Sequence, residues 1–133
     1  MSYRMIEHTA DLCFEVTAGS FEELAAEALR AMTEWSGPWW GSEAARRDFF
    51  LEAQDRAILL VDLLNEALTL SQIHRESYER IEFLRVGEHM AEGRFIGRTV
   101  TGATDEIKAV TYHGASVEHL SDGAWSATIL MDI

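Results

Sequence analysis

Residues 56–71 constrain the fold most, because apolar side chains surround much of the helix that they are expected to form. Asp55 is placed to cap a helix that begins at Arg56 and runs to about Ser71. Its apolar positions are Leu60, Val61, Leu63, Leu64, Ala67, Leu68 and Leu70. A helix with so little polar surface must be heavily buried. Asp62 and Glu66 lie one turn apart on it, and we interpret them as a solvated polar stripe.

A second helix is expected before it. Ser20 and Glu23 form a capping box, in which each side chain satisfies a free backbone amide at the helix start. Apolar residues then recur at helical spacing at Phe21, Leu24, Ala25, Ala28, Met32 and Trp35. Gly37 and Pro38 should end this helix, and residues 39–41 should continue as a loop. The Trp39–Trp40 pair in that loop is either a lid over the core or an exposed contact patch.

The rest of the chain is typical of strands. Residues 12–16 alternate between apolar and polar side chains, as in a half-buried strand. Further strands are expected at residues 48–53, 81–83, 95–99, 107–112, 117–120 and 125–133, with residues 87–89 and 92–93 in a connection. The last two strands should form a hairpin around residues 121–123. Two main helices packed on a mostly antiparallel sheet predict an α+β two-layer sandwich, in a single domain spanning residues 1–133.

Charge and cysteine content limit the function. The chain has 23 acidic and 11 basic residues, for a formal charge of −12, which argues against direct binding of nucleic acid. An acidic surface suits metal cations or a basic protein partner, although solubility alone also explains it. Cys13 is the only cysteine, so an intrachain disulfide and a cysteine metal cluster are both excluded. With no apolar run typical of a signal peptide or a membrane span, we expect a cytoplasmic protein that does not bind membranes.

Polar residues gather next to the expected secondary structure in three places. These are the segment 7–11, the group Lys108, Tyr112 and His113, and the C-terminal pair Asp132 and Ile133. Lys108 is the only lysine in a chain that otherwise uses arginine, which hints that its position needs a compact ammonium group. The signatures of a P-loop, a dinucleotide fold, a serine hydrolase and a zinc protease are all absent.

The first and last strands could be neighbours in the sheet. Asp11 would then join the Asp132 side chain and a terminal carboxylate on Ile133. Three oxygen ligands without a thiol favour Ca²⁺ or Mg²⁺ over zinc, and a cation would offset the repulsion between the carboxylates. His8 could be a ligand, could support a ligand, or could be purely structural.

Four segments of the chain together resemble the archease family. They are His8-Thr9-Ala10-Asp11, Val61-Asp62-Leu63-Leu64-Asn65-Glu66, Ile107-Lys108-Ala109-Val110-Thr111-Tyr112-His113, and Asp132-Ile133. They occur in the family's order and spacing across nearly the whole chain. Archeases are accessory proteins of the RtcB-type RNA ligase, which joins cyclic-phosphate or 3′-phosphate ends to 5′-hydroxyl ends in tRNA splicing and RNA repair.

The resemblance implies a non-catalytic protein that promotes guanylylation and multiple turnover of this ligase. It implies a divalent cation, with Ca²⁺ expected and Mg²⁺ or Mn²⁺ as alternatives, held by Asp11, Asp132 and the terminal carboxylate of Ile133. It assigns ligase activation to Lys108. Glu7, His8 and His113 would support the site from behind these residues.

Two other functions remain open at this stage. One is a general chaperone or modulator of nucleic-acid-modifying enzymes that works through apolar surface such as the Trp39–Trp40 pair. The other is a stand-alone metal-dependent phosphohydrolase, in which a metal polarises a phosphate and Lys108 stabilises the charge.

Overall fold

The computed structural model describes residues 1–7 and 11–133, which form two helices and seven strands. In chain order these are β1 (Ser2–Glu7), β2 (Asp11–Ala18), α1 (Phe21–Ser36), β3 (Pro38–Glu52), α2 (Arg56–His74), β4 (Glu76–Val86), β5 (Met90–Ala103), β6 (Ala109–His119) and β7 (Trp125–Asp132). Neither helix in this part of the chain is long and apolar enough to cross a membrane.

Both helices begin where their capping residues predict. The Ser20 hydroxyl accepts a hydrogen bond from the Glu23 backbone N–H, and the Glu23 carboxylate accepts one from Gly19. The Asp55 carboxylate likewise accepts a hydrogen bond from the backbone N–H of Ile58. The Ser20 and Asp55 side chains each satisfy an amide that the first helical turn leaves free, whereas Glu23 bonds the residue before the cap.

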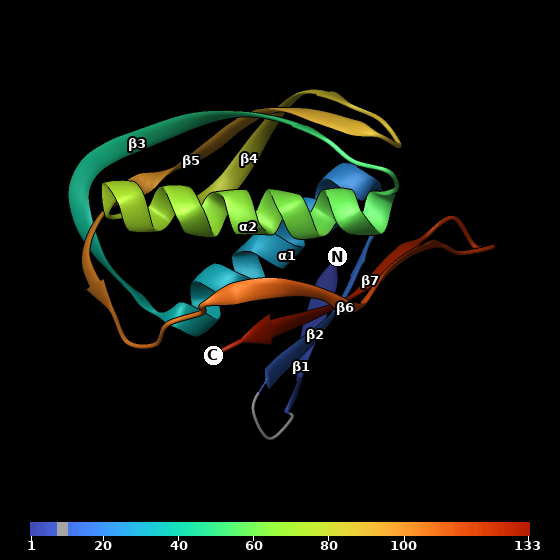
Figure 1. Ribbon diagram of the computed structural model, residues 1–133, viewed down its shortest axis with the longest axis horizontal. Helices are drawn as coiled ribbons and strands as arrows, with labels where there is room; N and C mark the ends of the chain where they lie inside the picture. Colours follow the sequence, from blue (N-terminus) through green and yellow to red (C-terminus); the bar gives the residue numbers. More distant parts are fainter. Residues whose placement is uncertain (8–10) are drawn as a thin grey trace.

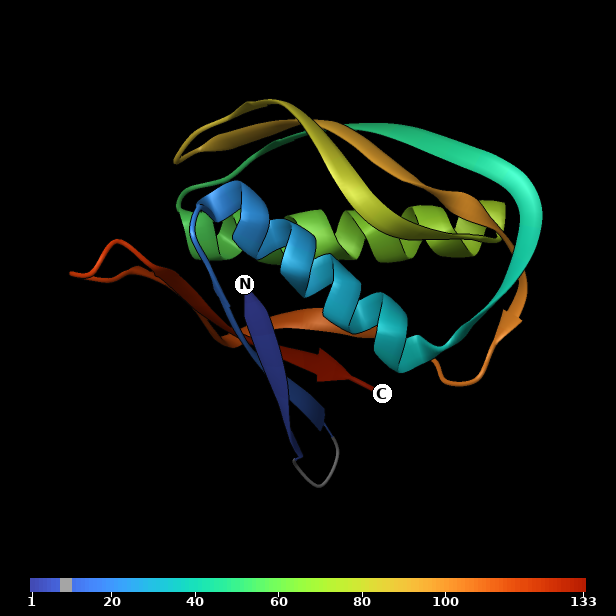
Figure 2. The ribbon, with the colours of Figure 1, turned by 180° about the vertical axis from the view of Figure 1, so that it is seen from behind.

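The seven strands divide between two antiparallel sheets that enclose the helices. One sheet has the order β1-β2-β7-β6 and the other has the order β3-β5-β4. Both helices contact both sheets, and Figures 1 and 2 show α1 and α2 lying between them. The predicted α+β class, with two helices and antiparallel strands, is confirmed. The second sheet explains why α2 is apolar on so many sides: it buries Leu59, Leu60, Val61, Leu63, Leu64 and Ala67.

The expected neighbourhood of the first predicted strand and the last is also confirmed. β2 pairs with β7 along its whole length, and the hairpin of β6 and β7 adds the outer strand. β2 turns Leu12, Phe14 and Val16 inward, and β7 turns Ala127, Ile129 and Met131 inward. Because side chains alternate along a strand, every second residue of both strands lies on the outer face of this sheet.

Two segments expected in loops belong to strands. Residues 39–41 lie in β3, which begins at Pro38 and accommodates them with irregular pairing on either side of Trp40. Residues 92–93 lie in β5, where Gly93 pairs with both Phe49 and Phe83. A Cβ atom at Gly93 would lie 2.3 Å from the Glu82 carbonyl oxygen, so glycine is needed there for close strand pairing rather than for a turn.

The sequence interpretation also missed one strand and divided another. β1 was not expected, although it pairs with β2 from Ser2 to Glu7. The strands expected at residues 107–112 and 117–120 are one strand, β6, whose pairing with β7 shifts between Thr111 and Ser116. Gly114 lies inside this irregular stretch with a φ angle of 72°, a left-handed conformation that glycine adopts readily.

Two buried carboxylates are each paired with an arginine, one within α1 and one across the three-stranded sheet. Glu27 of α1 is fully buried and accepts two 2.7 Å hydrogen bonds from Arg30. Glu76 at the start of β4 accepts hydrogen bonds of 2.8 and 2.7 Å from Arg47 of β3 and one of 2.9 Å from the Tyr78 hydroxyl. These bonds hold the pKa of Glu76 below its ordinary value, the Arg47 contact being the largest cause. Charges so far from water need such bidentate pairing.

Candidate functional site

The candidate site lies at the end of the four-stranded sheet where the carboxylates expected to bind a cation meet. Asp11, the first residue of β2, is the direct cross-strand partner of Asp132, the last residue of β7. On the other side of β7, Asp132 is paired with Ala109, the first residue of β6. The structure therefore brings together two acids that are 121 positions apart in the sequence.

Both aspartate side chains lie on the outer face of this sheet. The residues next to them, Leu12 and Met131, are turned inward and buried, so alternation directs Asp11 and Asp132 to the opposite face. Directly opposed residues of an antiparallel pair have Cβ atoms about 4.5–5.5 Å apart. Asp11 is partly exposed and Asp132 is exposed. Two acidic side chains are thus held close together on the outer face, at an end of the sheet that solvent ions can reach.

The backbone of Lys108 is bonded to Asp132. Its N–H donates a 2.8 Å hydrogen bond to the main-chain oxygen of Asp132. The prediction that Lys108 lies inside a strand is wrong by one residue, because β6 begins at Ala109. The Lys108 side chain is exposed, and among residues 1–7 and 11–133 it makes no ion pair within 4.0 Å.

Asn65 of α2 fastens the beginning of β6, and no role was predicted for it. Its side-chain amide donates a 2.8 Å hydrogen bond to the Val110 carbonyl oxygen and accepts one of 2.8 Å from the Val110 N–H. β6 is the outer strand of its sheet, so these two backbone groups face away from β7. The amide of Asn65 replaces the strand that is missing there. The signal in the sequence was an amide side chain among the apolar residues in the middle of this helix.

The polar residues beyond Val110 are only partly connected with the site. The Tyr112 hydroxyl donates a hydrogen bond to Asp62 of α2, and this bond raises the pKa of Tyr112. Asp62 is therefore not only part of a solvated stripe, as we interpreted it. His113 is exposed and lies in the irregular part of β6, where its N–H bonds to the Thr111 hydroxyl. It is not a cross-strand partner of Asp11 or Asp132.

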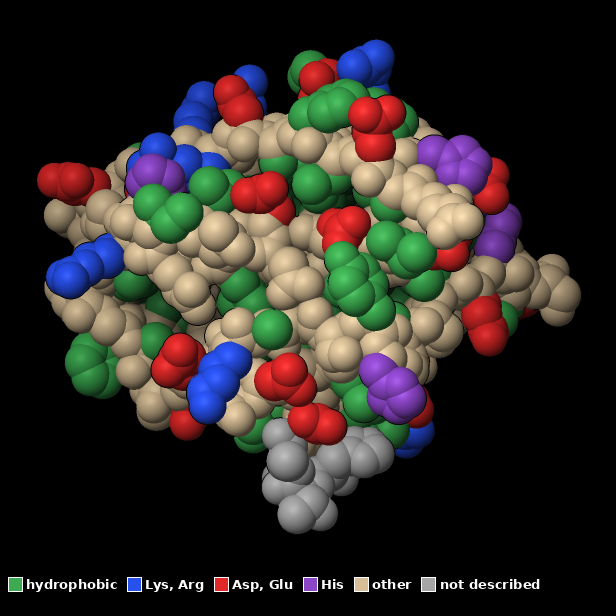
Figure 3. All heavy atoms as spheres, viewed as in Figure 1, with side chains coloured by type: hydrophobic (Ala, Val, Ile, Leu, Met, Phe, Trp, Pro, Cys, Tyr) green, Lys and Arg blue, Asp and Glu red, His purple; other side chains and the backbone are tan. Residues whose placement is uncertain are grey.

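Glu7 and His8 are the two other residues expected to support the site. The backbone of Glu7 ends β1, opposite Leu12. His8 lies outside the described residues. Figure 3 shows red acidic and blue basic atoms together just above the grey residues, in the region where Figure 1 places the C-terminus.

The donor chemistry of the Asp11–Asp132 pair suits a divalent cation. Within the described residues there is no group of three or more His, Cys, Asp or Glu side chains arranged to hold a metal. The Asp11–Asp132 pair is nevertheless a like-charge cross-strand pair, and such pairs are destabilising. Neither carboxylate forms an ion pair within 4.0 Å in the described part of the chain. Hard oxygen donors with uncompensated charge are what Ca²⁺ and Mg²⁺ prefer.

Solved structures share this fold. The crystal structure of a Thermotoga maritima protein described as an archease and possible chaperone has a TM-score of 0.73 and 26% identity, covering 96% of this chain and 94% of that one. The solution structure of Methanobacterium thermoautotrophicum protein 1598 has a TM-score of 0.74 and 24% identity, with 98% of each chain covered. The second similarity concerns the fold alone, because the identity is low.

Sequence comparisons lead to a family. "Protein archease" of Methanosarcina acetivorans is 30% identical over 144 residues, which cover 98% of this chain and 95% of that protein. "Protein archease" of Methanopyrus kandleri is 29% identical over 147 residues, with both proteins covered completely. The model of the Archease protein family (MTH1598/TM1083) matches residues 3–133. The chain therefore belongs to the archease family.

Proposed function

We propose that this protein is a non-catalytic, cytoplasmic activator of an RtcB-type RNA ligase. It would promote guanylylation of the ligase and sustain its multiple turnover through a cation site at the end of the four-stranded sheet. Membership of the archease family supports the partner. The observation that carries the site is the direct pairing of Asp11 with Asp132 beside the backbone of Lys108.

The cation would be held by Asp11, Asp132 and the terminal carboxylate of Ile133. Ile133 directly follows the paired Asp132 and is exposed. Oxygen ligands of this kind favour Ca²⁺, with Mg²⁺ and Mn²⁺ as alternatives. When bound, such a cation supplies positive charge next to anionic groups, such as phosphates, of the ligase–nucleotide complex.

Lys108 would contribute the second positive charge. Its backbone is anchored to β7 and, two residues later, to α2 through Val110, while its side chain remains exposed. An exposed ammonium on a fixed backbone is free to contact a nucleotide phosphate or a carboxylate of the partner. Because an ammonium is compact and a guanidinium is a planar fork, arginine should not replace it fully.

Net charge favours a basic protein partner. The chain carries a formal charge of −12, and a ligase that binds RNA needs basic side chains around its cleft. Opposite charges speed the encounter of two proteins, and this effect weakens as salt screens them. Ligase activation should therefore require more of this protein at high ionic strength.

The main experiment is an RNA ligation assay with the cognate ligase under multiple-turnover conditions. We expect the wild-type protein to raise turnover and the Asp132→Asn variant to remain folded but inactive, because it loses one carboxylate without changing size. Asp122→Asn is the matched control: Asp122 is exposed in the β6–β7 turn, and an asparagine keeps the oxygen that accepts the Ala124 N–H. Full multiple turnover with Asp132→Asn would refute the role of the site.

Direct binding measurements separate the cation from the lysine. Calorimetric titration with Ca²⁺ should show weaker binding for Asp132→Asn and unchanged binding for Lys108→Arg. In the ligation assay, Lys108→Arg should still lower turnover. If Lys108→Arg activates the ligase as well as the wild type, a bare positive charge is sufficient there and the argument for an ammonium is wrong.

A chaperone is the second candidate, because the Thermotoga maritima relative is described as a possible chaperone and Trp39 is 56% exposed here. A chaperone should suppress aggregation of unrelated proteins, and a chelator should not abolish the effect. Suppression that is lost with Trp39→Ala and kept with Asp132→Asn would favour this function over ligase activation.

A further inference from the structure

A cavity of about 450 Å³ lies between the helices and the end of the three-stranded sheet, away from the outer face that carries Asp11 and Asp132. The C-terminal turns of α1 and α2, the start of β4, the end of β5 and the segment before β6 form its walls. Its size is within the range of about 300–1,000 Å³ that is usual for ligand pockets. Ile107, the residue before Lys108, is part of its lining.

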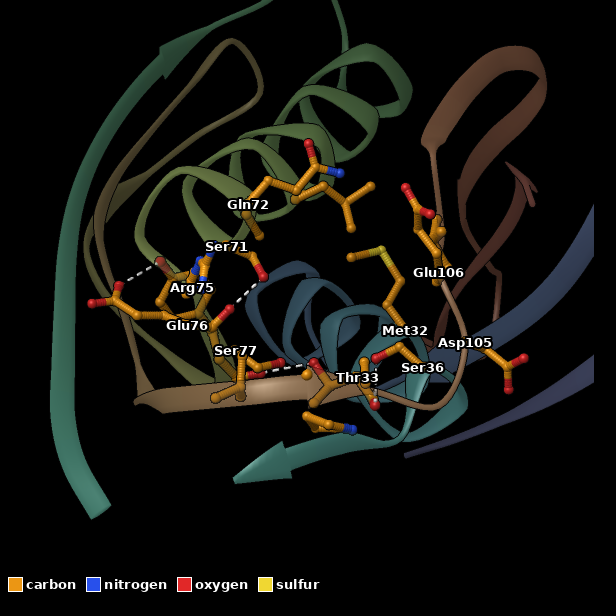
Figure 4. Close-up of a pocket in the computed structure, with 18 of the residues that line it drawn as sticks. Met32, Thr33, Ser36, Ser71, Gln72, Arg75, Glu76, Ser77, Asp105 and Glu106 are labelled. Carbon is orange, nitrogen blue, oxygen red and sulfur yellow. Dashed lines mark hydrogen bonds between the residues drawn. The ribbon is translucent and has the colours of Figure 1, made fainter. Parts of the chain in front are cut away.

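The floor of the cavity is apolar. Leu29 and Met32 of α1, Ala67 and Leu68 of α2, and Val100 of β5 line it. Figure 4 shows the Met32 side chain pointing into the open space between the two helices. Such a floor favours an aliphatic or aromatic group.

Three hydroxyl groups of the lining already donate hydrogen bonds within the protein. Thr33 donates to the Tyr78 carbonyl oxygen at 2.8 Å, Ser36 donates to the Thr33 carbonyl oxygen at 3.0 Å, and Ser71 donates to the Glu76 carbonyl oxygen. A hydroxyl has one hydrogen and two lone pairs, so what these groups still offer a ligand is acceptor capacity. The dashed lines of Figure 4 mark these bonds. These three groups therefore favour a ligand that brings hydrogen-bond donors.

The charge of Glu106 on the cavity wall favours a cationic ligand, whereas that of Arg75 does not. Glu106 is exposed, stands on the wall opposite Arg75 in Figure 4, and forms no ion pair within 4.0 Å in the described part of the chain. Glu76 also lines the cavity but is paired with Arg47. Asp105 points away from the cavity in Figure 4. Arg75 is exposed on the opposite wall and would favour an anion.

An exposed tryptophan extends this surface. Trp39 is 56% exposed, and its indole N–H donates a 3.3 Å hydrogen bond to the Thr104 hydroxyl at the cavity wall. Its ring lies against Gly102, where an added Cβ atom would meet the ring at 2.8 Å. Trp40 is instead covered by the Arg98 guanidinium, 4.8 Å from the ring centre. Trp39 is therefore a fixed aromatic surface, of the type that dominates binding energy in protein interfaces.

We infer that this cavity, with Trp39, receives a basic side chain of a partner protein, an arginine or lysine whose aliphatic stem packs on Met32 and whose charged end meets Glu106. The inference rests on the proposed function only in taking the RNA ligase as the source of that segment. The cavity and Trp39 would then determine the affinity for the ligase, while the separate cation site would determine its activation.

The first test uses a small probe without the ligase. N-acetyl-arginine amide should shift the NMR signals of the Trp39 indole N–H and the Met32 methyl group, and Glu106→Gln should weaken this binding about fivefold or more. Glu118→Gln is the matched control, because Glu118 is exposed on β6, away from the cavity lining. The inference would be overturned if N-acetyl-glutamate amide or a short RNA bound more strongly than N-acetyl-arginine amide. It would also be overturned if none of these probes bound.

The second test separates docking from activation in the ligation assay. Trp39→Ala and Glu106→Gln should raise the concentration of this protein needed for half-maximal activation about fivefold, with unchanged turnover at saturation. Phe50→Ala, which removes an aromatic ring of similar exposure from the three-stranded sheet, should change neither value. An unchanged half-maximal concentration in both cavity variants would sink the docking contact, whereas a wild-type protein that fails to activate would refute the proposed function alone.

Discussion

Replacing Asn65 with alanine tests whether one helix side chain holds the strand next to the candidate site. The change removes two 2.8 Å hydrogen bonds to Val110, a residue that is only 3% exposed. Each bond is worth about 1 kcal/mol, and a buried backbone group left unpaired costs about 1–3 kcal/mol. Since a water molecule could enter the space and bond to one of the two groups, we expect Asn65→Ala to lower the free energy of unfolding by about 2–4 kcal/mol.

Equilibrium unfolding in urea, followed by circular dichroism, measures this loss. Thr69→Ala is the control on the same helix, because Thr69 is exposed and its replacement should change stability by less than about 0.5 kcal/mol. Hydrogen exchange adds a local measurement: the Val110 amide should lose protection in Asn65→Ala beyond the change in global stability. A loss below about 0.5 kcal/mol with unchanged protection of Val110 would refute the argument.

The Asn65→Asp variant adds a test of direction. At pH 7 its carboxylate still accepts the Val110 N–H but faces the Val110 carbonyl oxygen, which raises the pKa of the new acid. A group whose pKa is raised by folding stabilises the protein fully when the pH is below the pKa of the unfolded state, about 3.9 for aspartate. This stabilisation is lost as the pH rises through the pKa of the folded state. Asn65→Asp should therefore approach wild-type stability as the pH is lowered, whereas Asn65→Ala should not.

Two further predictions concern the three-stranded sheet. Arg47→Met leaves the Glu76 carboxylate buried without its cation, and since Arg47 is about one-third exposed we expect a loss at the lower end of the usual range, about 3 kcal/mol at pH 7. The pKa of Glu76 is lowered by folding, so its contribution to stability is complete above about pH 4.3 and is lost as the pH falls through the pKa of the folded state. In urea unfolding, the difference in stability between Arg47→Met and the wild type should therefore be smaller at about pH 3 than at about pH 7. An equal difference at both pH values would contradict this. Gly97→Ala would place a Cβ atom 1.8 Å from the Ser77 carbonyl oxygen, so β4 and β5 must separate at a cost of about 2–4 kcal/mol. Gly87→Ala has no atom within 4 Å of its new Cβ and should be nearly neutral; equal stability of the two alanine variants would show that the strand contact is not tight.

The sequence predicted those parts of the site that depend on strand alternation and on neighbouring residues. Alternation in β2 and β7 indicates which residues face the core, so Asp11 and Asp132 could be expected to share the outer face once the strands pair. Lys108 was identified by its rarity. Neither its hydrogen bond to Asp132 nor the role of Asn65 could be predicted, because both join segments that are far apart in the chain.

Local signals were misleading where backbone pairing decided the structure. Residues 39–41 and Gly93 look like loop residues because glycine and proline usually interrupt strands. In the folded chain Trp39 and Trp40 pair with β5, and Gly93 lies within β5, where the close approach of Glu82 requires glycine. Likewise, Trp39 and Trp40 cannot be told apart in the sequence, yet one ring is exposed at a cavity and the other lies under Arg98.

The sequence by itself determined where both helices begin, the antiparallel α+β class and the face of each inner strand, because caps and alternation depend on residues within one turn or one strand. Tertiary structure alone decided that the strands divide into two sheets around the helices, that Asp11 lies directly opposite Asp132, and that a cavity remains next to Ile107. These features depend on pairing and packing between segments whose separation along the chain carries no local signal.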